Sequence, residues 1–237
     1  ALQFADVLSK STDEDNSERH KIWAQEIVAL LKAMYPDNPA VLDYFGTVLL
    51  STENYLGLSK NAPGFYGRTL LDRFYTEFNM EFLSIPAEKG NHFFRSQKIV
   101  YDRLTEPYFS YSGPTSMGKS YIMRMFIKKQ VMDGSKLNFA IIVPTKALIN
   151  EVYSKIIDDL KIDNTTGYLS ERNYTIITSA GALQLKKEHR NFIFVLTPER
   201  LLYLLISHPE ITIDYLFIDE AHKISARDSR SAFYYKV

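Results

Sequence analysis

Hydrophobic positions recur at helical spacing through the first third of the chain. Apolar side chains three or four positions apart share one face of a helix. This spacing predicts three amphipathic helices, over residues 19–35, 40–55 and 69–82. A turn cluster, Asn61-Ala-Pro-Gly64, separates the last two. The apolar stripe of the third helix is expected to face the core rather than to form a ligand site; it comprises Leu70, Phe74, Phe78 and Met80.

The pattern changes after Pro86-Ala-Glu-Lys-Gly-Asn91, which marks a boundary. Beyond it, short apolar runs alternate with helical spacing. Strands are predicted at 108–112, 137–143, 174–178, 192–196 and within 211–218, and helices at 121–132, 146–160 and 198–207. Such alternation is typical of an α/β fold, a parallel sheet with helices on both faces. The chain is therefore divided into an all-α segment, residues 1–88, and an α/β domain, residues 89–237.

Composition narrows the function classes only slightly. Among 237 residues, Lys+Arg and Asp+Glu both number 28, so a nucleic-acid site has to be a local patch rather than a global field. The basic runs 128–129 and 186–190 are interpreted as solvated surface, and the alternative is that they form part of such a patch. The chain has no cysteine, which excludes disulfides and cysteine-ligated zinc and suits a cytoplasmic protein.

The two ends and the hydropathy add two expectations. No apolar run approaches the ~20 residues that a membrane helix needs, and the first residues lack the regions of a signal peptide. We therefore expect no membrane partner. Because the chain does not begin with Met and stops at Val237, soon after an acidic turn, we expect it to be part of a longer protein.

One stretch carries a clear chemical pattern. Residues 113–120 read Gly-Pro-Thr-Ser-Met-Gly-Lys-Ser, the G-x-x-x-x-G-K-S pattern of a phosphate-binding loop. Gly113 and Gly118 permit backbone conformations in which N–H groups converge on phosphate oxygens. Lys119 is expected to approach the β and γ phosphates of ATP, and Ser120 to offer its hydroxyl to Mg²⁺. Thr115 lies within the same loop.

A second acidic motif lies downstream. The apolar run Tyr215-Leu-Phe-Ile218 leads directly into Asp219-Glu-Ala-His222. Carboxylates at the carboxyl end of a buried strand are where such a sheet holds its metal ion. We therefore expect Asp219 to bind Mg²⁺ and Glu220 to polarise the attacking water.

Together these residues give the chain a family resemblance. From about residue 91 onward it resembles the first RecA-like motor domain of a superfamily 2 DExH helicase. Residues 113–120 match motif I, and residues 219–222 match motif II. Residues 143–151 resemble motif Ia, residues 197–201 resemble motif Ib, and residues 93–97 resemble an adenine-reading F-x-x-x-Q motif. The residues of motifs Ia and Ib, together with Arg230 after the acidic motif, are similar to those of the Ski2-like branch.

The resemblance implies roles for further residues. Gln97 would contact adenine, and His222 would couple the nucleotide site to a second RecA-like domain. The backbone of one DNA or RNA strand would be held by four residues, Thr145, Lys146, Thr197 and Arg200. Hydroxyls and single basic residues at helix starts suit phosphate contacts, which carry no sequence information.

The sequence departs from the family pattern at several positions. Lys146 stands where Arg is common, Glu151 where Gln is common, and Met117 where a small residue is usual. Motif III and the second RecA-like domain, which brings the arginine finger, are absent from these 237 residues. An arginine finger accelerates hydrolysis about 10³-fold or more, so this chain alone is expected to hydrolyse ATP poorly.

Three functional hypotheses follow. The first is an ATP-dependent helicase or translocase on DNA or RNA. The second is an ATP-gated interaction module whose nucleotide state controls a partner protein, such as a nuclease in anti-phage defence, docked on the N-terminal helices. The third is a small-molecule kinase, which has no use for motifs Ia, Ib and II.

Overall fold

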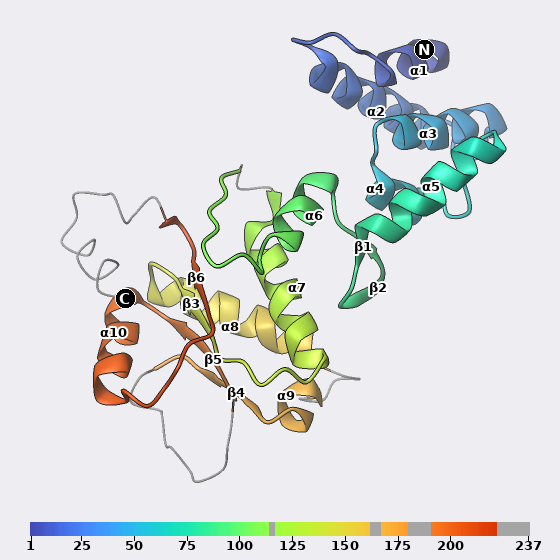
Figure 1. Cartoon of the computed structure of the whole chain (residues 1–237). Helices are drawn as coiled ribbons and strands as arrows, with labels where there is room; N and C mark the ends of the chain where they lie inside the picture. The colour runs from blue at the N-terminus through green and yellow to red at the C-terminus, as the bar shows by residue number, and fades with distance from the viewer. Residues whose placement is uncertain (114–116, 162–166, 180–190, 222–237) are drawn as a thin grey trace. The chain divides into compact units, whose positions relative to one another are not determined.

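The computed structural model describes residues 1–113, 117–161, 167–179 and 191–221 (Figure 1). It divides into two compact units, Ala1–Arg103 and Leu104–Val237. This division by contacts falls later than the sequence-based boundary after residue 88. It assigns the hairpin β1–β2 and helix α6 to the same unit as the N-terminal helices.

The first unit is helical. Its helices are α1 (Leu2–Ser9), α2 (Ser17–Met34), α3 (Pro39–Ser51), α4 (Tyr55–Asn61) and α5 (Leu70–Leu83). A short antiparallel hairpin, β1 (Ser84–Ile85) and β2 (Glu88–His92), leads into α6 (Arg95–Asp102). The three predicted helices are present, although the second one is interrupted: Asn54 starts α4 by accepting a hydrogen bond from the Gly57 N–H at 2.8 Å. The stretch 86–91, predicted as a boundary, forms most of the hairpin.

Helix α5 has its apolar face outward. Leu70, Phe74 and Phe78 are 87%, 67% and 62% exposed, so the prediction that they face the core is wrong. The buried positions are instead Thr76, Asn79 and Leu83. Thr76 and Asn79 satisfy their polar groups locally, because both donate hydrogen bonds to backbone carbonyls one turn earlier in the helix. The core of this unit is formed mainly by α1–α4, with Val28, Phe45, Val48 and Leu58 at its centre.

The second unit is a parallel sheet with helices on both faces, the RecA-like α/β fold that the sequence predicts. Its elements are α7 (Lys119–Met132), β3 (Phe139–Ile142), α8 (Lys146–Leu160), α9 (Gly167–Glu171), β4 (Tyr174–Ile177), β5 (Asn191–Leu196), α10 (Pro198–Ser207) and β6 (Tyr215–Ile218). The strand order is β4-β5-β3-β6, and each neighbouring pair is parallel.

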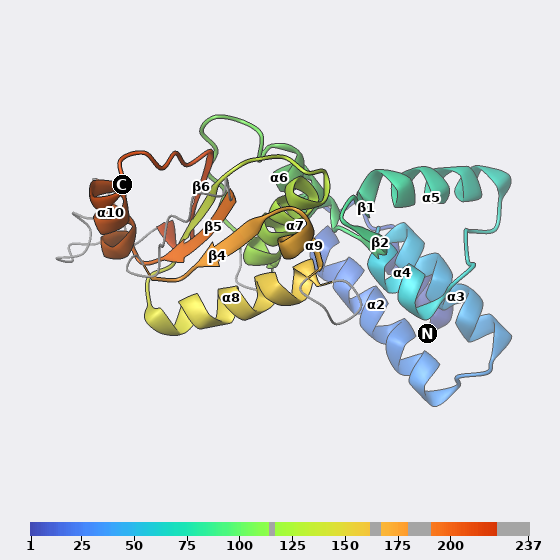
Figure 2. The same ribbon diagram turned by 90° about the horizontal axis from the view of Figure 1, so that it is seen from below.

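The two faces of the sheet are covered by different helices (Figure 2). On one face, Phe126 of α7 packs edge-on against Tyr215 and Phe217 of β6. On the other face, Leu201 and Leu204 of α10 join Ala140, Ile142, Phe194 and Leu196 in one cluster. The β3 strand is buried at every position, as expected of a central parallel strand.

One predicted strand is not formed. Residues 108–112 lie outside every strand of the described sheet. Tyr108 is 98% exposed, and the Tyr111 hydroxyl donates to the Lys119 carbonyl at 3.3 Å. Tyr111 therefore bonds to the first residue of α7, and the segment pairs with no strand of the described sheet. No helix of the described chain is long and apolar enough to cross a membrane.

Candidate nucleotide and nucleic-acid site

Three of the predicted motifs lie at one edge of the sheet. In the strand register, Ile142 of β3 pairs with both Leu196 of β5 and Ile218 of β6, so these strands end side by side. Asp219 and Thr197 follow β6 and β5 directly, and Thr145 comes shortly after β3. The carboxyl edge of a parallel sheet is where α/β folds of this kind bind ligands.

The phosphate loop leads directly into helix α7. Gly118 adopts a left-handed conformation with φ of 72°, which a glycine reaches without steric cost. Its carbonyl accepts hydrogen bonds from the N–H groups of Tyr121 and Ile122, so it caps the first turn. Lys119 Nζ donates to the Gly113 carbonyl at 2.8 Å and thereby spans the loop. Ser120 is half-buried in the first turn of α7, and Thr115 lies outside the described residues.

Tyr111 connects the loop with the acidic motif. Its hydroxyl bonds to the Lys119 carbonyl, and its ring stacks on Phe109 at a centroid distance of 5.7 Å. Burial raises the pKa of the Tyr111 hydroxyl, and the negative charge of Asp219 raises it further. Tyr111 thus lies close to both Lys119 and Asp219. Sequence reasoning missed this residue because nothing in the motif pattern singles out a side chain before the loop.

The first two residues of the acidic motif, Asp219 and Glu220, form a turn directly after β6. The Asp219 N–H donates to the Ile142 carbonyl at 3.0 Å and thereby extends the β3–β6 ladder by one residue. The Glu220 N–H donates to Asp219 Oδ1 at 2.9 Å. Glu220 has a φ of 53°, an uncommon conformation for a non-glycine residue. Glu53 and Asn173, which lie outside the motifs, share this conformation. His222 and Arg230 lie outside the described residues.

Motif Ia begins helix α8. The Thr145 hydroxyl oxygen accepts a hydrogen bond from the Leu148 N–H at 3.4 Å and caps the helix. Both Thr145 and Lys146 are exposed at its N-terminus. Glu151 forms an ion pair with Lys155 one turn later, and this hydrogen bond lowers the pKa of its carboxyl group. Its negative charge is therefore compensated by Lys155.

Motif Ib begins helix α10 and is more buried than motif Ia. Thr197 is buried at the N-cap position. The guanidinium group of Arg200 donates from Nη1 to the Thr178 carbonyl at 2.8 Å, just beyond the end of β4. In this arrangement Arg200 joins α10 to the edge strand.

Gln97 has a structural partner in the described chain. Its side-chain oxygen accepts a hydrogen bond from the Phe94 N–H at 2.9 Å, which caps α6, and the residue is buried. It belongs to the first compact unit, whereas the phosphate loop belongs to the second.

Comparison with known proteins agrees with this geometry. A family model for DEAD/DEAH box helicases matches residues 95–237. A protein of Rattus norvegicus named "probable ATP-dependent RNA helicase DDX52" is 27% identical over 128 residues, which cover 52% of this chain and 21% of that protein. Its Mus musculus counterpart is 28% identical over the same shares. The chain thus spans about a fifth of the length of these curated relatives. No solved structure matches the chain significantly.

The family match covers more than half of the chain and includes the loop, the acidic turn and the parallel sheet that brings motifs Ia, Ib and II to one edge. The chain belongs to the DEAD/DEAH box helicase family.

Proposed function

We propose that this chain supplies the first motor half of an ATP-dependent helicase or translocase on DNA or RNA. The observation that carries the proposal is the common edge of β3, β5 and β6, where Thr145, Thr197 and Asp219 follow strands that end in register. A single edge with a phosphate loop, a carboxylate and helix N-termini suits a nucleotide beside a nucleic-acid backbone.

The residues present fit ATP and Mg²⁺ by their chemistry. Mg²⁺ prefers oxygen ligands, and the Ser120 hydroxyl and the Asp219 carboxylate are such donors. We assign Gly113, Thr115 and Gly118 to the backbone cradle for the phosphates and Lys119 to the β and γ phosphates. Bound Mg²⁺ neutralises charge on the phosphates when ATP is present.

Glu220 is proposed as the catalytic base. It is exposed beside Asp219, and its uncommon backbone conformation sets the direction in which the side chain leaves the main chain. A carboxylate at that place can orient a water molecule and accept its proton. Lys119, held at the Gly113 carbonyl, keeps its ammonium group at the loop to stabilise charge on the phosphates.

Thr145 and Lys146 are the stronger candidates for contacts with nucleic acid. Both are exposed at the N-terminus of α8, where backbone N–H groups and the helix dipole favour a phosphate group. Thr197 is buried and Arg200 bonds to Thr178, so their contacts with nucleic acid require a change of local geometry. For Gln97 we retain the proposed contact with adenine, and for His222 the proposed coupling to a second RecA-like domain of the same polypeptide.

Two finer assignments belong to the same proposal. The residues of motifs Ia and Ib support the Ski2-like branch, and residues 89–237 are proposed as the motor domain, with 1–88 as an accessory segment.

The second candidate function, an ATP-gated module that controls a partner such as a nuclease, is favoured by one observation. The outward apolar face of α5 in the accessory segment is a type of surface on which proteins bind each other.

The test is ATP hydrolysis by the longest natural polypeptide that contains this chain. The rate is measured without nucleic acid and with single-stranded DNA, duplex DNA and RNA. We expect strong stimulation by one of them, lost in Lys119→Ala and in Glu220→Gln. Lys161→Ala, at the far end of α8 and paired with Asp158, is the matched control. Slow hydrolysis that is indifferent to every nucleic acid would favour the ATP-gated module instead.

A further inference from the structure

Gly113 and Met117 are packed against each other across the phosphate loop. A Cβ atom built on Gly113 would lie 2.3 Å from the sulfur of Met117 and 3.6 Å from its Cγ. Contacts below 3.0 Å are essentially never made by real Cβ atoms. The Met117 thioether therefore occupies the space that a methyl group on residue 113 would take, and such a group would displace this end of a flexible side chain.

The same glycine also receives Lys119. Its carbonyl accepts the hydrogen bond from Lys119 Nζ at 2.8 Å. Two side chains from the end of the loop thus converge on its first residue, one on its α-carbon and one on its carbonyl oxygen. Gly118, between them in sequence, is in the left-handed conformation with φ of 72°.

The contact is too small to matter greatly for folding. Each pair of touching heavy atoms contributes only about 0.1–0.2 kcal/mol, and methionine is a flexible side chain that fills irregular gaps. Its importance lies in geometry. Catalytic groups must be held within about 0.5 Å of their productive positions, and the position of the Gly113 carbonyl sets where the Lys119 ammonium is held.

We infer that Met117 is a positioning residue of the phosphate loop. Its thioether supports the Gly113 backbone, and the Gly113 carbonyl in turn holds the ammonium group that binds the phosphates. The inference rests on the proposed function of this loop as the nucleotide site. It also joins two features of the sequence: Met117 replaces a usually small residue, and the glycine at position 113 leaves room for it.

A double-mutant cycle tests the coupling. Gly113→Ala, Met117→Ala and the double variant are compared for the dissociation constant of a fluorescent ATP analogue, and for KM and kcat separately. We expect Gly113→Ala to weaken binding about threefold when Met117 is present, because the added methyl group displaces the thioether, and less than about twofold when residue 117 is Ala, in line with the coupling of residues in contact. Met117→Ala alone should weaken binding about threefold, and the volume-conserving Met117→Leu should restore it to within about twofold.

A merely structural role would give a different result. It predicts that nucleotide affinity follows thermal stability, whereas positioning predicts weaker binding at an unchanged midpoint of thermal unfolding. Met132→Ala, at the half-buried last position of α7, is the matched control and should leave affinity unchanged.

Two failures remain distinguishable. If Lys119→Ala binds ATP as well as the natural chain does, the loop is not the nucleotide site and the proposed function fails. If Lys119→Ala abolishes binding but Gly113→Ala has the same effect in both backgrounds, only the inference about Met117 is overturned. Should Gly113→Ala not fold, equal affinities of Met117→Ala and the natural chain would overturn it, and weaker binding restored by Met117→Leu would support it.

Discussion

The hydroxyl group of Tyr111 bonds to the backbone carbonyl of Lys119 at 3.3 Å, and the Tyr111 side chain lies close enough to Asp219 for the carboxylate to raise the pKa of the hydroxyl group. One aromatic side chain therefore contacts the residue that begins α7 and approaches the residue that follows β6. The two motifs that we propose to bind the nucleotide are thus joined by a residue that belongs to neither pattern.

Replacing Tyr111 by Phe removes this bond and keeps the ring. A typical hydrogen bond contributes about 0.5–1.5 kcal/mol, so we expect ATP affinity to fall about two- to tenfold. Titration with a fluorescent ATP analogue measures it. Tyr108→Phe is the control, because Tyr108 is 98% exposed. Equal affinities of the two variants would show that the Tyr111 bond does not support the loop.

The ion pair between Arg124 of α7 and Asp159 of α8 should contribute to stability. Both side chains are mostly buried, 12% and 16% exposed, so Asp159→Asn leaves a buried guanidinium group without its counter-charge. We expect the free energy of unfolding to fall by about 1–3 kcal/mol, measured by urea denaturation.

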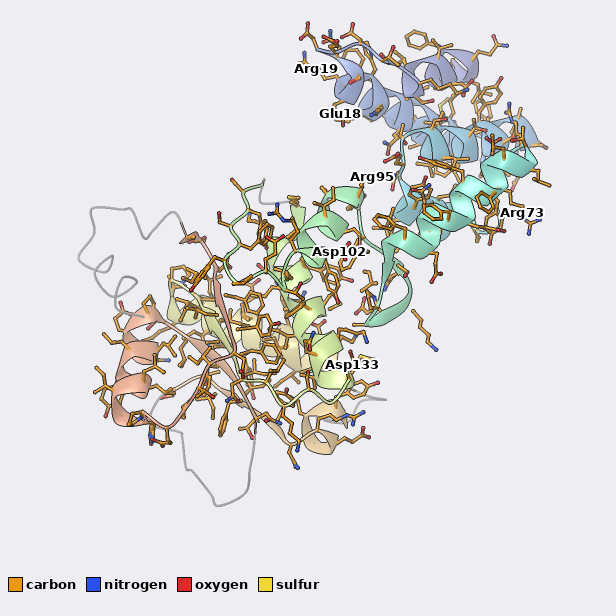
Figure 3. The ribbon with its side chains drawn as sticks, viewed as in Figure 1. Glu18, Arg19, Arg73, Arg95, Asp102 and Asp133 are labelled. Carbon is orange, nitrogen blue, oxygen red and sulfur yellow. The ribbon has the colours of Figure 1, made fainter. Side chains whose placement is uncertain are left out.

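The matched control for that pair is an exposed one on α5. Arg73, labelled in Figure 3, bonds to Glu77 at 3.0 Å, and the two side chains are 64% and 50% exposed. Surface pairs contribute little, so Glu77→Gln should change the free energy of unfolding by no more than about 0.5 kcal/mol. A loss as large as that of Asp159→Asn would mean that burial does not set the difference.

Tyr174 should make stability depend on alkaline pH. Its hydroxyl group donates to the Ser135 carbonyl and accepts from the Leu137 N–H, so it ties β4 to the segment before β3. Burial raises its pKa above the ordinary value of 10.0. The folded state thus holds this proton more tightly than the unfolded state. The associated stability is fully present below the unfolded pKa and is lost as pH rises through the folded pKa.

Tyr174→Phe should remove both hydrogen bonds and this part of the alkaline dependence. The measurement is the midpoint of urea unfolding at a series of pH values from 8 upward. Tyr203→Phe, on an exposed tyrosine of α10, should leave the profile as it is. An unchanged profile in Tyr174→Phe would assign the alkaline dependence to other groups.

Lys146 should contribute to nucleic-acid binding through phosphate alone. Lys146→Ala is expected to weaken binding by a similar factor for every sequence and to reduce the slope of log affinity against log salt by about 1. Fluorescence anisotropy at several salt concentrations measures both. Lys161→Ala, at the other end of α8, should change neither value, and a sequence-dependent loss in Lys146→Ala would indicate contacts with bases.

Much of the second unit could be predicted from sequence because its signals are local. The predicted helices 146–160 and 198–207 have the observed bounds, because apolar spacing marks the first and Pro198 suits the start of the second. The strands β3, β5 and β6 read as short apolar runs, although β6, at the edge of the described sheet, is only half-buried. Their common edge follows from parallel pairing, and this brought motifs Ia, Ib and II together.

Other features of the fold and of the site depend on tertiary contacts that cannot be predicted from local sequence patterns. The strand predicted at 108–112 needs a neighbouring ladder, and the hydrogen bond of Tyr111 takes the segment elsewhere. Helical spacing located α5, but it does not say which face is covered. Thr76 and Asn79 can lie inside because both donate to carbonyls of their own helix and because Asn79 Oδ1 accepts a hydrogen bond from Arg95 at 3.0 Å. The supporting contact of Met117 on Gly113 likewise requires coordinates.

The outward apolar face of α5 has a consequence for the behaviour of the protein in solution. Leucine and phenylalanine side chains exposed to water make a surface whose mutual attraction grows with temperature and with excluded salts such as sulfate. Colloidal stability should therefore be lowest in warm, sulfate-rich buffers and improve with low concentrations of urea.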